Sequence, residues 1–163
     1  KSYGKQSKNN SSLKSRYRLM WMDAVYEPGE VKVVAYNKDG KAVAEKTVRT
    51  AGKPHHIELV SNRNELTADG KDLAYVTVKV VDKDGNLCPT DSRLIHFSVK
   101  GAGKFRAVAN GDPTNLEQFH LPKMHAFHGM LTAIVQAGEI AGDLVLTAKA
   151  SGVKTGTVHL QAK

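Results

Sequence analysis

The stretch Ala74-Tyr75-Val76-Thr77-Val78-Lys79-Val80 decides the fold class of this sequence. Positions 74, 76, 78 and 80 are small or branched and apolar, whereas Thr77 and Lys79 between them are polar. A period of two places alternate side chains on opposite faces, as in a pleated strand with one buried side. Asp82-Lys83-Asp84-Gly85-Asn86 follows and has the composition of a turn. The stretch therefore predicts a half-buried strand that ends in a tight turn.

The same alternation recurs along the chain, and helical spacing with caps is nearly absent. Asn37-Lys38-Asp39-Gly40 has the composition of a hairpin turn between two of the alternating segments. Many short strands separated by turn signals predict an all-β sandwich or barrel. The further candidate strands are Tyr17 to Trp21, Val31 to Tyr36, Ala42 to Val48, His56 to Val60, Leu94 to Val99, Phe105 to Ala109, Met130 to Gln136, Leu144 to Ala150 and Thr155 to Leu160.

A domain boundary is predicted at Ala51-Gly52-Lys53-Pro54, where Gly and Pro stop one strand before the next begins. Residues 53–163 have room for about seven strands, which matches the ~100 residues of an immunoglobulin-like sandwich. Residues 1–52 offer only three or four strands, too few to close a two-sheet core. The first part therefore either lacks its opening strands or packs on its neighbour.

The composition limits the classes of protein that the chain could belong to. Of the 163 residues, 40% are hydrophobic and 25% charged, which suits a β-sandwich core and not a membrane protein. The sequence starts at Lys1 with no signal segment, so we expect a fragment of a longer protein. Cys88 is the single cysteine, which excludes an internal disulfide and a cysteine-based zinc site.

Basic residues without any acid fill residues 1–18, and the whole chain has a formal net charge of +8. Such an arm can be the footprint of nucleic-acid binding. Here, however, the basic residues stand among Ser, Asn, Gln and Gly with a single Tyr and no nucleic-acid motif. A solvated loop or strand end is the interpretation we favour, and nucleic acid is not an expected partner.

The segment Tyr26-Glu27-Pro28-Gly29-Glu30-Val31-Lys32-Val33-Val34-Ala35-Tyr36 resembles the Y-x-P-G-x-L-x-x-x-A-Y strand of an immunoglobulin-like domain. That domain belongs to family 2 glycoside hydrolases of the β-galactosidase type. In the family, a stretch similar to N-G-K-S-x-G precedes this strand, and the present chain opens with Lys1-Ser2-Tyr3-Gly4. The resemblance implies that the chain begins inside that domain, with its opening strands missing.

Residues 53–163 resemble the C-terminal domain that follows in those enzymes, which is itself similar to the immunoglobulin-like repeats of bacterial invasin and intimin. One matching segment runs from Leu66 to Val78 and contains Ala68-Asp69-Gly70, and a second runs from Val81 to Asn86. The narrower match is Asn110-Gly111-Asp112-Pro113-Thr114, with the later Phe119, Ala126-Phe127 and Gly129. A histidine-rich tract, His120, His125 and His128, departs from the family pattern, and no function is transferred to it.

The resemblance implies a parent enzyme with a catalytic TIM barrel in which two glutamates perform retaining glycoside hydrolysis. That chemistry needs two carboxyl groups ~5 Å apart, and a barrel needs ~200 residues with alternating strands and helices. The present glutamates lie in turns, strand faces or loops without a paired pattern. We therefore expect no catalytic residue, no cofactor and no metal in this chain. His55-His56 and the histidine-rich tract are expected to be solvent-facing or hydrogen-bonded rather than metal ligands.

Four residues of one loop are candidates for a contact with another domain or a sugar: Asn110, Gly111, Asp112 and Thr114. Asn and Asp bond back to nearby amides, Gly supplies a positive φ and Pro fixes the exit, so the loop is first of all predicted to be rigid. Three aromatic residues are assigned structural roles. Tyr26 is a candidate tyrosine corner, Trp21 is expected in a core rather than as a sugar platform, and Phe127 belongs to the family-like segment.

The sequence thus predicts an accessory, non-catalytic module of a secreted or periplasmic bacterial glycoside hydrolase. Its expected partners are the catalytic and other domains of the parent enzyme, with carbohydrate as an alternative and no membrane. The competing hypothesis is a carbohydrate-binding or adhesion module, which the invasin-like pattern supports.

Overall fold

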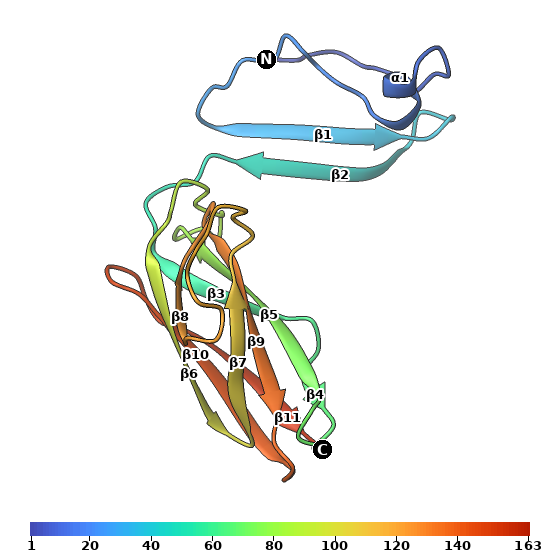
Figure 1. Cartoon of the computed structure of the whole chain (residues 1–163). Helices are drawn as coiled ribbons and strands as arrows, with labels where there is room; N and C mark the ends of the chain where they lie inside the picture. Colours follow the sequence, from blue (N-terminus) through green and yellow to red (C-terminus); the bar gives the residue numbers. More distant parts are fainter. The chain divides into compact units, whose positions relative to one another are not determined.

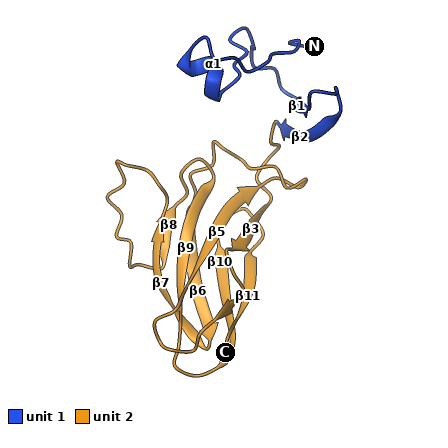
Figure 2. Ribbon diagram, turned by 90° about the vertical axis from the view of Figure 1, so that its right-hand side faces the viewer, with its two compact units in different colours: residues 1–49 blue, residues 50–163 orange.

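The stretch quoted first is the central part of β5 (Leu73–Val81) in a computed structural model that describes residues 1–163. Its burial alternates as predicted, since Ala74, Val76, Val78 and Val80 are fully buried and Tyr75 is exposed. The chain divides into two compact units, unit 1 (Lys1–Arg49) and unit 2 (Thr50–Lys163), which Figure 2 shows in separate colours. The sequence had predicted a division after residue 52.

Unit 2 consists of two β-sheets that enclose one core (Figure 1). Strand neighbours are antiparallel except for the parallel pair β4–β11. The four-stranded sheet has the order β3 (His56–Ser61), β5, β9 (Met130–Ala137) and β7 (Gly103–Ala109). The five-stranded sheet has the order β4 (Glu65–Leu66), β11 (Gly156–Ala162), β10 (Gly142–Lys149), β6 (Leu94–Gly101) and β8 (Lys123–His125). The predicted all-β sandwich is confirmed.

The core of unit 2 receives side chains from both sheets, so this unit closes its own interior. The largest fully buried side chains of the five-stranded sheet are Ile95, Met124, Leu144 and Leu146. They meet the valines of the four-stranded sheet in one hydrophobic cluster. Full burial of each aliphatic side chain contributes roughly 1.5–3 kcal/mol. Unit 2 therefore has the means to fold without unit 1.

Two strands of unit 2 were not predicted from the sequence, because neither is long enough to show a period. β4 has two residues and β8 has three, and each lies at an edge of the five-stranded sheet. The other strands of unit 2 lie where alternation predicted them, with ends shifted by one or two residues.

Unit 1 contains a short helix and a two-stranded ribbon. The strand predicted from Tyr17 to Trp21 is wrong, because α1 (Leu13–Tyr17) ends there and irregular backbone follows. Ser12 caps this helix by accepting the N–H of Ser15 at 3.1 Å. A local capping box therefore overrides an alternation of only three residues. α1 has five residues, and no helix of the chain is long and apolar enough to cross a membrane.

The ribbon of unit 1 pairs β1 (Glu30–Tyr36) with β2 (Ala42–Arg49) around the predicted Asn37 turn. Its two faces differ. One face has ion pairs of 2.8 Å between Arg49 and Glu30 and between Lys32 and Glu45. The register places Val31 opposite Val48 on the other face, and Val33 shares that face. These valines are all exposed. The ribbon thus has one face with ion pairs and another with exposed valines.

Candidate functional site

The predicted loop from Asn110 to Thr114 follows the edge strand β7 and is held by short local hydrogen bonds. The Asn110 Oδ1 atom accepts the N–H of Asp112 at 3.0 Å. The Asp112 Oδ1 atom accepts the N–H of Thr114 at 2.9 Å and its hydroxyl at 2.8 Å. The Thr114 N–H lowers the pKa of Asp112 below its usual range. Gly111 has the positive φ of 79° that such a turn requires. These local bonds and the positive φ are those that the composition of the loop predicted.

Two side chains, Asn110 of the loop and Glu117 just after it, bond the loop to β8. The Asn110 Nδ2 group donates to the carbonyl of His125 at 3.0 Å. Glu117 accepts the backbone N–H of His125 at 3.1 Å and lies 3.0 Å from its Nδ1 atom. Sequence reasoning missed Glu117, because its partner lies eight residues away and no motif marks the pair. The polar groups of the loop therefore bond to the chain itself rather than pointing outward.

The histidines have separate surroundings, except for the adjacent pair His55 and His56. The His128 Nδ1 atom is 3.3 Å from the carbonyl of Pro89, and its ring stacks edge-on against Phe127 at 4.2 Å. The Nδ1 atoms of His55 and His56 are 3.0 Å apart, the distance of a hydrogen bond between a protonated and an unprotonated nitrogen. No group of three or more His, Cys, Asp or Glu side chains is placed to hold a metal ion.

A second polar network centres on Asp82, the one charged side chain of the chain that is buried, with 2% of its surface exposed. Its Oδ2 atom accepts the N–H of Gly52 at 2.7 Å. Its Oδ1 atom accepts the N–H groups of Asp84 and Asn86, each at 2.9 Å. These donors, led by the Gly52 N–H, hold the pKa of Asp82 far below its usual range. Asp82 therefore ties the entry of the chain into unit 2 to the turn after β5.

Cys88 lies beside this network and is buried as a free thiol. Burial raises the pKa of its thiol, and the neighbouring Asp82 and Asp91 carboxylates raise it further. A thiol that resists ionisation is unreactive. Cys88 thus belongs to the packing at this end of unit 2.

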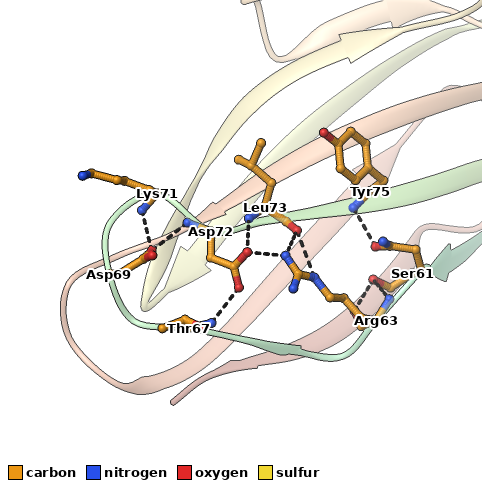
Figure 3. A network of polar contacts seen from close by, with 9 residues as sticks. Ser61, Arg63, Thr67, Asp69, Lys71, Asp72, Leu73 and Tyr75 are labelled. Carbon is orange, nitrogen blue, oxygen red and sulfur yellow. Dashed lines mark hydrogen bonds and ion pairs between the residues drawn. The ribbon is translucent and has the colours of Figure 1, made fainter.

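A third network, drawn in Figure 3, joins Arg63 and Asp72 at the other end of unit 2. Asp72 accepts the N–H of Thr67 at 2.8 Å and pairs with the Arg63 guanidinium, and the Thr67 N–H is the leading cause of its lowered pKa. Arg63 also donates from Nε to the carbonyl of Leu73 at 3.1 Å. Asp69 accepts the N–H groups of residues 71 and 72, each at 2.8 Å. This network fixes the connection between β4 and β5, and the carboxylates of Asp69 and Asp72 accept hydrogen bonds from backbone amides.

The glutamates are likewise engaged with basic partners. Four of the seven form ion pairs, with Lys32, Arg49, Lys79 and Lys163, and Glu117 contacts the imidazole of His125.

The three aromatic residues assigned structural roles have different surroundings. Trp21 is partly buried, and its indole Nε1 atom is buried without a hydrogen-bond partner. Phe127 is partly buried and pairs with Met130 in an isolated β-bridge. Tyr26 lies just before β1 with its side chain exposed. The tyrosine-corner assignment stays a prediction.

Comparison with known proteins finds one matching family domain in each unit. Residues 57–159 match the glycoside hydrolase family 2 C-terminal domain 5, and residues 1–44 match a domain of unknown function, DUF4982. The β-galactosidase BoGH2A of Bacteroides ovatus is 41% identical over all of this chain, which spans 18% of that protein. A β-glucuronidase of Formosa agariphila is 27% identical over 94% of the chain, which spans 16% of its length.

Solved structures support the same assignment. A family 2 glycosyl hydrolase of Bacteroides cellulosilyticus shares 31% identity and a TM-score of 0.79 over 86% of this chain, which covers 18% of that protein. The adhesin InvE of Yersinia pseudotuberculosis has a TM-score of 0.43, a likeness too weak to bear on function. The resemblance to family 2 enzymes is confirmed. The chain therefore belongs to the glycoside hydrolase family 2 C-terminal domain 5 family.

Proposed function

We propose that the chain is a non-catalytic accessory module of a secreted bacterial family 2 enzyme with β-galactosidase activity. Glycosidic bonds are hydrolysed by a barrel domain elsewhere in the parent protein. One observation supports this role most strongly. The chain aligns over its whole length with a β-galactosidase of which it spans 18%, while its own acids are bound to amides and cations.

Unit 1 forms part of a larger immunoglobulin-like domain in this proposal. A two-stranded ribbon is at best marginally stable by itself in water. The ion pairs on one face of β1–β2 and the exposed valines on the other have the pattern of a sheet that covers a core. Strands contributed by the preceding part of the parent polypeptide would cover the valine face. Unit 2, with its closed core, is the complete domain.

Removal of unit 2 from the parent enzyme tests the accessory role. Deletion of residues 50–163 is expected to lower the melting temperature of the parent by about 5 °C or more, because a packed interface between domains is lost. Hydrolysis of a small aryl galactoside should persist, since its catalytic residues lie elsewhere. The measurements are differential scanning calorimetry and kcat/KM for the small substrate.

Two outcomes would argue against the proposal. An unchanged melting temperature with unchanged kinetics would remove the accessory role. Intact stability combined with a raised KM for polymeric substrate alone would indicate a carbohydrate-binding module instead.

A further inference from the structure

A shallow hollow of about 420 Å³ lies on unit 2, between the start of β3 and the turn that joins β10 to β11. Its volume falls within the ~300–1,000 Å³ of ordinary small-ligand sites. One wall consists of Pro54 and His55, and the other of Gly152, Val153 and Lys154. Both walls belong to unit 2, so the hollow lies within one compact unit. We call it the 54–154 hollow.

Backbone hydrogen bonds hold the two walls of the 54–154 hollow together. The N–H of Lys154 donates to the carbonyl of His55 at 2.9 Å, and the N–H of Ile57 donates to the carbonyl of Lys154 at 3.1 Å. His55 also donates its N–H to the carbonyl of Val81 in β5 at 2.8 Å. Figure 1 shows this place, where β3 begins beside the turn between β10 and β11. A site that is held in place before binding loses little conformational entropy when a ligand binds.

Lys154 supplies a positive charge that no carboxylate of the chain neutralises. It takes part in none of the ion pairs of the chain. The two acids near the start of β3 are already engaged. Glu58 bonds to Lys79 at 3.0 Å, and Asp82 accepts backbone N–H groups. The hollow therefore offers an unpaired cation, which suits a ligand that carries a negative charge.

The imidazole of His55 has one nitrogen left for a ligand. Its Nδ1 atom lies 3.0 Å from the Nδ1 atom of His56, and the two rings stand edge-on with their planes 88° apart. This contact orients the ring and occupies Nδ1, whereas the Nε2 atom of His55 has no partner in the chain. Nε2 donates a hydrogen bond when it is protonated and accepts one when it is not. It can therefore bond to a carboxylate in the first form and to a sugar hydroxyl in the second.

We propose that the 54–154 hollow binds a sugar that carries a carboxylate, namely a hexuronic acid. The Lys154 ammonium pairs with the carboxylate, and His55 bonds to the carboxylate or to a neighbouring hydroxyl. Pro54 and Val153 are partly buried and supply apolar surface for the C–H groups of the ring.

This binding goes beyond the accessory role in the parent enzyme. The choice of a sugar over other carboxylates rests on the proposed function, because the parent hydrolyses glycosidic bonds. A shallow hollow with an exposed cation binds weakly, so a Kd of about 1 mM is expected.

Titration of the 163-residue chain with matched sugars tests the site. The probes are methyl β-glucuronide, its neutral counterpart methyl β-glucoside, and acetate as a carboxylate without a sugar. NMR spectra follow the amides of His55, Gly152 and Val153. The glucuronide is expected to shift these amides saturably, with a Kd about 3- to 5-fold lower than that of the glucoside or of acetate.

Every other result overturns the proposal. No saturable shift with the glucuronide removes the site. Equal affinity for the glucoside removes the role of the carboxylate, and equal affinity for acetate leaves a simple anion site without a sugar.

Matched lysine variants assign the binding to the hollow. Lys154→Gln removes the charge, leaves the backbone bonds in place, and should raise the Kd for the glucuronide about 3- to 5-fold. Lys104→Gln is the control, because Lys104 is also exposed but lies in β7, at the edge of the four-stranded sheet opposite β3. An unchanged Kd for Lys154→Gln, or an equal rise for both variants, would place the binding elsewhere. Melting temperatures of both variants should equal that of the starting chain, which shows that folding is intact.

Failure of this site and failure of the accessory role can be told apart. A parent whose stability and kinetics are unaffected by deletion of unit 2 refutes the accessory role. A parent that is destabilised by the deletion, together with a chain that does not bind the glucuronide, refutes only the 54–154 hollow as a sugar-acid site.

Discussion

Replacing Asp82 with alanine is expected to lower the melting temperature of unit 2 by about 10 °C, because it removes the buried acceptor of several backbone N–H groups at once. The N–H of Gly52 lies 2.7 Å from Oδ2, and the N–H groups of Asp84 and Asn86 lie 2.9 Å from Oδ1. Alanine leaves these donors without a partner and frees the entry segment. Thermal unfolding followed by circular dichroism measures the change.

Two controls separate the network from its surroundings. Asp82→Asn keeps one acceptor oxygen for the N–H groups of Asp84 and Asn86 but turns an amide NH2 toward the N–H of Gly52, so its loss should be smaller than that of Asp82→Ala. Asp84→Ala changes an exposed acid of the same turn and should have little effect. A melting temperature for Asp82→Ala within 2 °C or so of the starting protein, by the same scale, would contradict the role of the carboxylate.

The pH dependence has a definite sign. The pKa of Asp82 is lower in the folded chain than in the unfolded chain, mainly because of the Gly52 N–H. Its stabilisation is therefore fully present above the unfolded value of 3.8 and declines as the pH falls below it. The difference in stability between the starting protein and Asp82→Ala should shrink on acidification below that value.

Gly129→Ala is expected to destabilise unit 2 by about 3–4 kcal/mol. Gly129 has a φ of 74°, and a Cβ atom there would lie 2.3 Å from the carbonyl oxygen of Cys88. Its N–H donates to the backbone carbonyl of Asp91 and its carbonyl accepts the N–H of Val80, each at 2.8 Å, so both bonds hold this backbone in place. Denaturant unfolding monitored by circular dichroism gives the free energy.

Gly85→Ala is the matched comparison for the backbone conformation alone. Gly85 has a φ of 82° in the turn after β5, and a Cβ atom added there would have no neighbouring atom within 4 Å. Its substitution should cost about 1 kcal/mol. If both substitutions lower the free energy of unfolding by the same amount, the close approach of Gly129 to Cys88 has no part in the stability of unit 2.

How well alternation predicted the strands depended on their length and their environment. β5, β9 and β10 each have one face in the core and the other toward solvent, so a period of two was visible. β8 is too short to show any period, although its Met124 is fully buried. The segment around Tyr17 was wrongly predicted to be a strand, because a helix capped by Ser12 extends to Tyr17.

In the candidate site, contacts between residues close in sequence were predictable, whereas contacts between distant residues were not. The turn at Asn110 and Asp112 was predictable, because each side chain bonds to an amide two residues on. The bond from Gly52 to Asp82 spans 30 residues, and neither residue type signals the other.

Hydrolysis by the purified chain tests most directly whether it supports chemistry performed elsewhere. With p-nitrophenyl β-galactoside and β-glucuronide, the 163-residue chain is expected to release product no faster than buffer, while the full-length parent turns over the galactoside. Release that rises in proportion to the concentration of the isolated chain, and that survives removal of contaminating enzyme, would contradict the account.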